Sequence, residues 1–200
     1  MLRLSSHEDI VEFSKHSSKP VINALSDESH PCQILADLMT YQEEKGSIQG
    51  KKIAWIGDGC NVCQTYMQAA EIFDFELSIA TPAGYEPSEA FSQKYKKNIN
   101  FFNNPMQACK EADVVVTDVW TSMGQESEKK QRESSFKGFQ VDQLMMSQAK
   151  ADAVFMHCLP AYRGIEVSSE VIDGSQSVVW SEAENRLHAQ KSLLLYLIED

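Results

Sequence analysis

His157 and Cys158 are the two side chains whose setting in the sequence points most clearly to chemistry. They follow the short apolar run of residues 153–156, which predicts a buried strand of a parallel sheet. Pro160 ends that strand, because proline has no N–H for the ladder. In open α/β sheets, ligands bind just beyond the carboxyl ends of the strands, so a thiol there could bind a ligand or steer its protons. The alternative is a buried cysteine that packs as a small hydrophobic residue.

Polar side chains also follow other strands expected from the sequence. Asp58 and Asn61 lie in and after a glycine turn, residues 118–124 follow the apolar run that ends at residue 117, and residues 181–188 follow the last expected strand. Together these segments offer an amide, a carboxylate, a hydroxyl and a guanidinium besides the thiol. Such groups on one crevice are typical of a site for a small zwitterion with an anionic co-substrate nearby.

A helix start at residues 29–33 adds a candidate anion site. Pro31 suits the first helical position, with Ser29 or His30 as cap, and Gly46 is expected to end the helix. His30 and Gln33 then lie at the helix N-terminus, where free N–H groups and the positive end of the dipole favour an anion. Capping and a solvated polar turn are the alternative explanation.

The order of elements predicts the α/β class, with a doubly wound, Rossmann-like parallel sheet in three layers. Strands are expected at residues 52–56, 76–80, 99–102, 113–117, 153–156 and 177–180. Helices are expected at residues 61–73, 87–97, 105–111 and 182–198, and residues 124–133 are expected to form a loop. Residues 1–25 offer only a helix capped by Ser6 and a short strand near residues 20–24, which cannot form a core alone. They are therefore expected to be a remnant of a second α/β domain.

Composition excludes several classes of partner. The formal net charge of -11 argues against nucleic acid and anionic membranes, and no apolar run approaches membrane-spanning length. Five cysteines without a secretory signal favour a reducing cytoplasm over a disulfide framework.

Two cofactor motifs are incomplete. Cys60 and Cys63 have the spacing of a zinc or redox pair, but no second pair exists at ligand spacing. Gly57 and Gly59 match two glycines of a dinucleotide fingerprint, but Val62 takes the third place and would crowd the helix against the strand. We therefore expect neither a metal nor a nicotinamide cofactor.

Four segments in this order resemble the ornithine carbamoyltransferases, a resemblance that covers nearly all of the chain. They are residues 30–33 (His-Pro-Cys-Gln), residues 118–124 with their Ser-Met-Gly, residues 157–160 (His-Cys-Leu-Pro) and residues 184–188 (Glu-Asn-Arg-Leu-His). The resemblance implies transfer of a carbamoyl group from carbamoyl phosphate to L-ornithine, giving L-citrulline and phosphate, without a cofactor or metal and usually in a homotrimer.

The resemblance also implies roles for particular residues. The implied ornithine contacts are Asn61, Asp118, Ser122 and Met123. The implied carbamoyl phosphate contacts are Arg3, His30, Gln33, Cys158, Leu159 and Arg186. Cys158, Asp118, His30 and Arg186 are implied as the catalytic residues.

One departure from the family concerns its carbamoyl phosphate domain, which carries a Ser-Thr-Arg-Thr-Arg motif that these 200 residues do not contain. We therefore expect residues 1–45 to be a remnant of that domain with the interdomain helix, residues 46–181 to be the ornithine-binding domain, and residues 182–200 to be a helix that packs on the missing part. Activity of this chain by itself is accordingly in question. The second hypothesis is a non-catalytic amino-acid-binding or assembly module derived from the enzyme.

Overall fold

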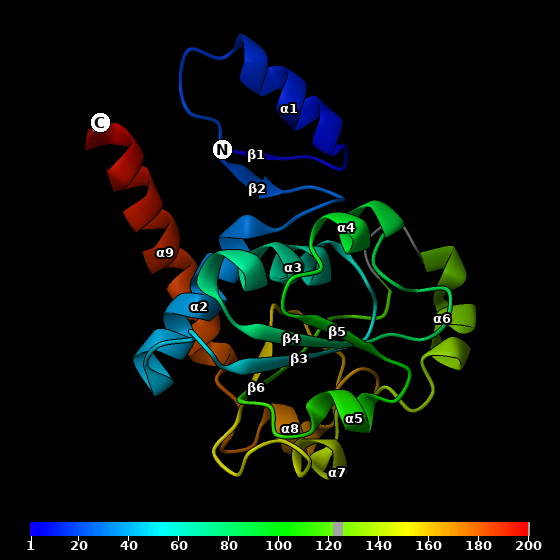
Figure 1. The fold of residues 1–200 in the computed structure, drawn as a ribbon. Coiled ribbons are helices and arrows are strands. Elements are labelled where there is room, and N and C mark those ends of the chain that lie inside the picture. The colour runs from blue at the N-terminus through cyan, green and yellow to red at the C-terminus, as the bar shows by residue number, and fades with distance from the viewer. Residues whose placement is uncertain (122–125, 200) are drawn as a thin grey trace.

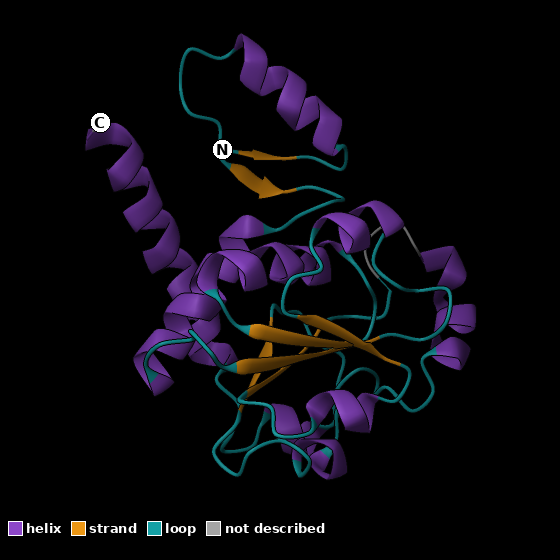
Figure 2. Cartoon of the chain, viewed as in Figure 1, coloured by secondary structure: helices purple, strands orange, loops and turns teal. Residues whose placement is uncertain are grey.

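The computed structural model of the chain describes residues 1–121 and 126–199, and a five-stranded parallel sheet forms its centre (Figures 1 and 2). The strands are β3 (Lys52–Ile56), β4 (Glu76–Ala80), β5 (Ile99–Phe102), β6 (Val114–Thr117) and β7 (Val154–His157). Their spatial order is β5-β4-β3-β6-β7, so the chain runs outward from β3 to one edge and then returns to β6 on its other side. This order confirms the predicted doubly wound sheet and places its switch point between β3 and β6.

Helices cover both faces of the sheet, because side chains that alternate along each strand point to opposite sides. Ile53 and Trp55 of β3 belong to one core with residues of α2 (Pro31–Lys45) and α3 (Asn61–Phe73). Ala54 and Ile56 belong to a second core with residues of α5 (Pro105–Cys109), α7 (Gln143–Met146) and α8 (Ser169–Ile172). The three predicted layers are therefore present.

The first residues form a separate small unit at one end of the molecule (Figure 1). Strands β1 (Leu2–Arg3) and β2 (Asn23–Leu25) pair in parallel, and helix α1 (His7–His16) connects them. The Ser6 hydroxyl accepts a hydrogen bond from the Asp9 N–H at 3.1 Å, as the predicted cap requires. Ile10 is the one buried residue of α1, whereas Phe13 is 54% exposed. The unit therefore has little core of its own.

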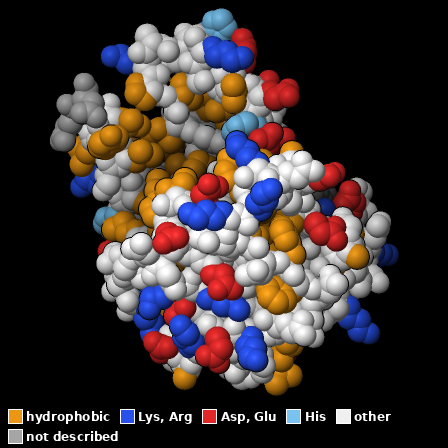
Figure 3. Space-filling view, in the orientation of Figure 1, with side chains coloured by type: hydrophobic (Ala, Val, Ile, Leu, Met, Phe, Trp, Pro, Cys, Tyr) orange, Lys and Arg blue, Asp and Glu red, His pale blue; other side chains and the backbone are white. Residues whose placement is uncertain are grey.

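The long C-terminal helix α9 (Val179–Glu199) packs against α2 through its first half. Asn185 donates hydrogen bonds to Thr40 and Glu43 of α2, at 3.0 and 2.7 Å. Beyond that contact, hydrophobic side chains gather on the surface of α9 and on the neighbouring N-terminal unit (Figure 3). The exposed ones on α9 include Leu187, Leu194, Leu195, Tyr196 and Ile198. Among the described helices, α9 included, none combines the length and apolarity needed to cross a membrane.

The predicted strand at residues 177–180 is wrong. Ser177 forms a single parallel bridge with Phe155 of β7, and α9 begins at Val179. The apolar Val-Val-Trp run suggested a strand, but the Val178 carbonyl accepts the Glu182 N–H and starts the helix instead. The carboxylate of Glu182 is then placed against the end of β7, where it accepts the His157 N–H at 2.9 Å.

The loop predicted at residues 124–133 is also wrong over its described part. A short 3-10 helix η1 (Glu126–Glu128) leads into α6 (Lys129–Ser135). Arg132 of α6 is buried and donates to the Asp58 carboxylate at 2.8 Å and to the Trp120 carbonyl at 2.9 Å. The remaining helix between β4 and β5 is α4 (Glu89–Lys94), which is shorter than the predicted helix over residues 87–97.

Candidate active site

The carboxyl ends of β3, β6 and β7 meet at one edge of the sheet. Their register pairs Ile56 with Thr117, and Thr117 with His157. The next residues along the chain, Asp118 after β6 and Cys158 after β7, therefore emerge side by side at the switch point. The sequence predicted this convergence from the strand ends.

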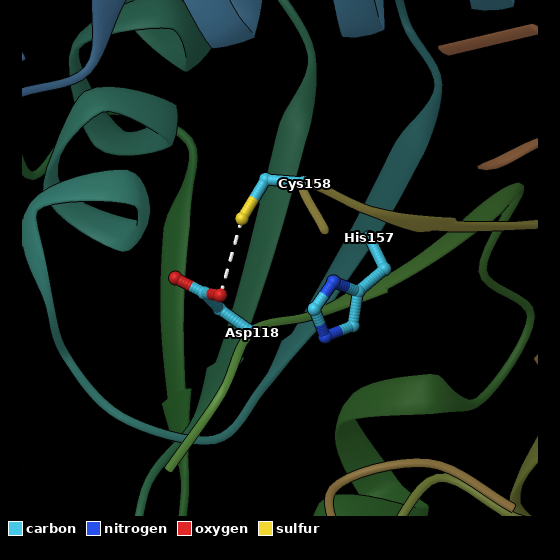
Figure 4. A group of neighbouring side chains, drawn as sticks. All are labelled: Asp118, His157 and Cys158. Carbon is cyan, nitrogen blue, oxygen red and sulfur yellow. Dashed lines mark hydrogen bonds between the residues drawn. The ribbon is translucent and has the colours of Figure 1, made fainter. Parts of the chain in front are cut away.

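Asp118 and Cys158 are in direct contact (Figure 4). The Cys158 thiol donates to Asp118 Oδ1 across 3.1 Å, and the same oxygen accepts the Val119 N–H at 2.7 Å. A second thiol, that of Cys60 at the start of α3, lies 3.7 Å from Asp118 Oδ2. The carboxylate is therefore held from both sides, and its orientation at the crevice is fixed.

Cys158 is a proton donor rather than a thiolate. Burial raises the pKa of its thiol well above the ordinary value, and the negative charge of Asp118 raises that pKa further. Because the thiolate is the nucleophilic form of cysteine, a protonated Cys158 is suited to positioning a ligand.

His157 shapes the turn that carries Cys158. Its Nδ1 accepts the Leu159 N–H at 2.9 Å, and its Nε2 lies 3.3 Å from the buried carboxylate of Glu166. Leu159 has a φ of 52°, in the left-handed region that non-glycine residues seldom adopt. The His157 imidazole thus helps to hold Leu159 in a left-handed backbone conformation, through the hydrogen bond that it accepts from the Leu159 N–H.

Ligand atoms of Asp118, His157 and Cys158 lie within 4.8 Å of one another, which is close enough for a metal ion. The Nδ1 lone pair of His157 is already used by the Leu159 N–H, however, and the Cys158 proton is shared with Asp118. The donor atoms therefore bond to each other and to the backbone, and we assign no metal to them.

The predicted anion side of the site comes from three elements, β1, α2 and α9. His30 is the N-cap of α2 and is buried, and its backbone N–H donates to Thr65 at 2.8 Å. Burial lowers the pKa of His30 to about 4, and the nearby charges of Arg186 and Arg3 contribute to that shift. His30 is thus a neutral imidazole at pH 7. Among the described residues, its Nδ1 is buried without a hydrogen-bond partner.

Gln33 and Arg186 complete this side. The Arg186 guanidinium on α9 donates from Nη1 to Gln33 Oε1 at 2.5 Å, and its Nε is buried without a partner in the described structure. Two unpartnered polar atoms, on His30 and Arg186, therefore lie at the place where the sequence predicted an anion.

Of three further predicted ornithine contacts, Asn61 lies within the described residues, and Ser122 and Met123 do not. Asn61 opens α3 near Cys60, but its amide donates to the Ser26 carbonyl at 2.6 Å and so anchors the segment before α2. Ser122 and Met123 lie outside the described residues.

Sequence reasoning missed Arg132, Asp37 and Glu182. Arg132 also stacks over the Tyr85 ring, with 4.9 Å between the guanidinium carbon and the ring centroid. Asp37 and Glu182 are buried beneath Gln33, and both accept its amide. The only available signal for Asp37 was a charged residue within the apolar pattern of α2.

The buried groups of this site predict opposing effects of pH on stability. The His30 pKa is lower in the folded chain than in the unfolded one, so His30 makes the free energy of unfolding rise as pH rises from about 4 to 6.5. Burial raises the Asp37 pKa to about 6, so Asp37 makes the free energy of unfolding fall over nearly the same range.

We therefore expect His30→Gln to remove a rise of about 3 kcal/mol across this pH range, and Asp37→Asn to remove the fall. Urea unfolding from pH 4 to 7 measures both changes. Identical pH profiles for the two variants would contradict the burial assigned to these groups.

Comparisons with known proteins agree with the resemblance found in the sequence. The family model described as "Aspartate/ornithine carbamoyltransferase, Asp/Orn binding domain" matches residues 49–197. The model described as "Aspartate/ornithine carbamoyltransferase, carbamoyl-P binding domain" matches residues 1–43.

Two curated relatives and one solved structure among the matches are named ornithine carbamoyltransferases. The ornithine carbamoyltransferase of Ruthia magnifica is 63% identical over 198 residues, 99% of this chain and 66% of that protein. That of Nitrosococcus oceani is 59% identical over 99% of this chain and 65% of that protein. The crystal structure of the Burkholderia thailandensis ornithine carbamoyltransferase matches with a TM-score of 0.90 and 47% identity, over 98% of this chain and 63% of that one. The chain thus spans slightly less than two thirds of these relatives.

Proposed function

Because the chain belongs to the aspartate/ornithine carbamoyltransferase family, we propose that it is the ornithine-binding part of an ornithine carbamoyltransferase. The reaction would join L-ornithine and carbamoyl phosphate to give L-citrulline and phosphate. The observation that carries the proposal is the Asp118–Cys158 hydrogen bond at the switch point of the sheet.

The proposed chemistry begins with the δ-amine of ornithine, which must be neutral to attack. Its nitrogen forms a bond to the carbamoyl carbon, the bond from that carbon to the phosphate oxygen breaks, and the amine gives up a proton. A protonated Cys158 is suited to steer this amine, and the Asp118 carboxylate is suited to accept its proton. Asn61 is proposed as a further contact to ornithine.

The anion side would stabilise the other half of the reaction. As the tetrahedral carbon forms, the carbonyl oxygen gains negative charge, which His30 and Arg3 can stabilise. Arg186 offers a planar guanidinium fork to the leaving phosphate. Gln33 and Leu159 are proposed to contact the carbamoyl group.

We propose the same division of the chain as the sequence suggested. Residues 1–45 would belong to the carbamoyl phosphate domain and its connecting helix, residues 46–181 would bind ornithine, and residues 182–200 would pack on the remainder of that domain. The apolar side chains exposed on α9 support the last assignment.

A homotrimer and a cytoplasmic location are the proposed assembly and setting. The cysteines are all free thiols, which supports a reducing compartment. Light scattering after size exclusion would measure the assembly.

A titration with ornithine, followed by calorimetry, tests the proposal. We expect the chain to bind ornithine and Asp118→Asn to weaken binding about tenfold or more, because a charge-assisted hydrogen bond contributes ~1.5–3 kcal/mol. Asp152→Asn is the matched control, since the Asp152 side chain is 78% exposed and its nearest cationic partner is Lys45 at the surface. Equal affinity in both variants would remove Asp118 from the ornithine site.

The second candidate is a non-catalytic binding or assembly module, which would need the Asp118–Cys158 crevice but not the phosphate-side groups. The same titration in excess carbamoyl phosphate, on the chain mixed with the carbamoyl phosphate domain of a relative, separates the two functions. In an enzyme site the substrates meet, so carbamoyl phosphate should change the ornithine affinity. In a binding module the affinity should stay the same.

A further inference from the structure

Two carboxyl groups are buried together beneath Gln33. Asp37 lies one turn after Gln33 on α2 and is 3% exposed, and Glu182 lies in the first turns of α9 and is 1% exposed. The amide nitrogen of Gln33 donates to both, to Asp37 Oδ1 at 2.8 Å and to Glu182 Oε1 at 2.9 Å. Both hydrogens of this amide are therefore used.

The amide of Gln33 can satisfy these contacts in one orientation only. With its nitrogen between the two acids, its oxygen Oε1 points away from them and accepts from Arg186. A flipped amide would turn its nitrogen toward the Arg186 guanidinium and its oxygen toward the two acids, and so lose the Arg186 hydrogen bond and at least one of the two to the acids. The acid pair thus decides which end of the amide faces Arg186.

The other oxygens of the pair are also used. Asp37 Oδ2 accepts the Tyr66 hydroxyl at 2.6 Å, and Glu182 Oε2 accepts the His157 N–H at 2.9 Å. Burial raises the pKa of Asp37 to about 6, and burial and then the charge of Asp37 raise that of Glu182 well above its ordinary value. Two buried carboxyl groups this close together therefore resist being ionised at the same time. The groups that face the pair are Arg186, Tyr66, His157 and, at longer range, Cys158.

The neighbours of Gln33 Oε1 offer complementary groups to a ligand. Arg186 Nε and His30 Nδ1 are buried without partners within the described residues, and His30 lies one turn before Gln33. A free guanidinium N–H suits a phosphate oxygen, whereas an amide oxygen suits an N–H donor. A carbamoyl group carries such N–H donors, and an acetyl group carries a methyl in their place.

We propose that Asp37 and Glu182 are positioning residues that hold the Gln33 amide oxygen toward the acyl group of the substrate, so that the site selects carbamoyl phosphate over acetyl phosphate. The inference rests on the proposed function and deepens it. The pair acts through Gln33, and its loss should change the preference between ligands more than the overall fold.

Side-chain amide NMR of the 200-residue chain tests the orientation of Gln33 without any ligand. The Gln33 signals, assigned by their loss in Gln33→Glu, should be protected from solvent exchange and should titrate near pH 6, where Asp37 ionises. In Glu182→Gln they should shift and lose protection. Glu184→Gln is the matched control, because Glu184 lies on the same helix and is exposed.

If the chemical shifts of the Gln33 amide do not change between pH 4 and 8 in the wild-type chain, the proposal is overturned. Unchanged signals in a folded Glu182→Gln would do the same. The pH titration of the Gln33 signals in the wild-type chain tests the proposal even if Glu182→Gln does not fold.

A pair of stable ligands tests the selectivity. Phosphonoacetamide keeps the amide N–H donors, and 2-oxopropylphosphonate has a methyl in their place. At millimolar ligand, we expect the wild-type chain to prefer the amide about tenfold, as one hydrogen bond allows, and Glu182→Gln to lose most of that preference. An equal preference for phosphonoacetamide in the wild-type chain and in Glu182→Gln would refute the proposed selectivity. Failure of both phosphonates and of ornithine to bind would refute the proposed function, while the Gln33 signals still report on the acid pair.

Discussion

The purified 200-residue chain is expected to form citrulline from ornithine and carbamoyl phosphate at or near the background rate. Arg3, Arg186 and the neutral His30 are the groups proposed for the phosphate side, and the Ser-Thr-Arg-Thr-Arg motif does not occur in these 200 residues. Each charge-assisted contact to a phosphate contributes ~1.5–3 kcal/mol, so the lack of several such contacts lowers affinity by roughly 10³-fold or more. Citrulline measured by mass spectrometry at fixed substrate concentrations gives the rate.

A second polypeptide, carrying the carbamoyl phosphate domain of a relative, provides the control. If the exposed apolar residues of α9 and the first 43 residues recognise that domain, the mixture should gain activity over either part alone. Leu187→Asp and Ile198→Asp on α9 should reduce the gain, since both side chains are exposed. Robust citrulline formation by the chain alone would mean that some other group of these residues replaces the arginine-bearing motif.

Replacement of Cys158 by serine should weaken ornithine binding and lower turnover of the completed enzyme by about 10–100-fold, with activity still measurable. The hydroxyl keeps a hydrogen bond to Asp118 but loses the larger sulfur, which lies 3.1 Å from that carboxylate. Cys158→Ala should behave similarly, because steering an amine contributes less than an obligatory nucleophile does. Steady-state kinetics with ornithine as the varied substrate measure both changes.

Cys60→Ser is the matched comparison, since its thiol approaches the same carboxylate at the longer distance of 3.7 Å. A smaller effect is expected there. Covalent catalysis would show as a carbamoyl group on Cys158 before ornithine is added, together with ping-pong kinetics. Such a result would contradict the positioning role of Cys158.

The sheet was predictable because its strands are short apolar runs separated by helices. Strand β3 and helix α3 occur at the predicted residues 52–56 and 61–73. The strand predicted at residues 177–180 and the loop predicted at residues 124–133 were wrong because tertiary contacts there outweigh the local sequence pattern. Polar residues near 129–135 form a helix whose Arg132 is buried against Asp58, a contact between positions 74 residues apart.

The site was predictable only in part. The contact between Asp118 and Cys158 follows from parallel strands ending at one edge, so its prediction needed only the order of elements. No comparable rule predicts that Asp37 and Glu182 are buried together beneath Gln33. Gln33 and Glu182 are 149 residues apart in sequence, and no spacing or periodicity relates them.

The proposed anion side of the site takes its residues from β1, from the start of α2 and from α9, near both ends of the chain. Loop closure of that length is slow and comes late in folding, so this part of the site should form only when the whole chain has folded. A protease cut anywhere between α2 and α9 would then remove anion binding even where the sheet survives. Protection of α9 amides from hydrogen exchange should accordingly rise when an anion binds, and clipping should abolish that response.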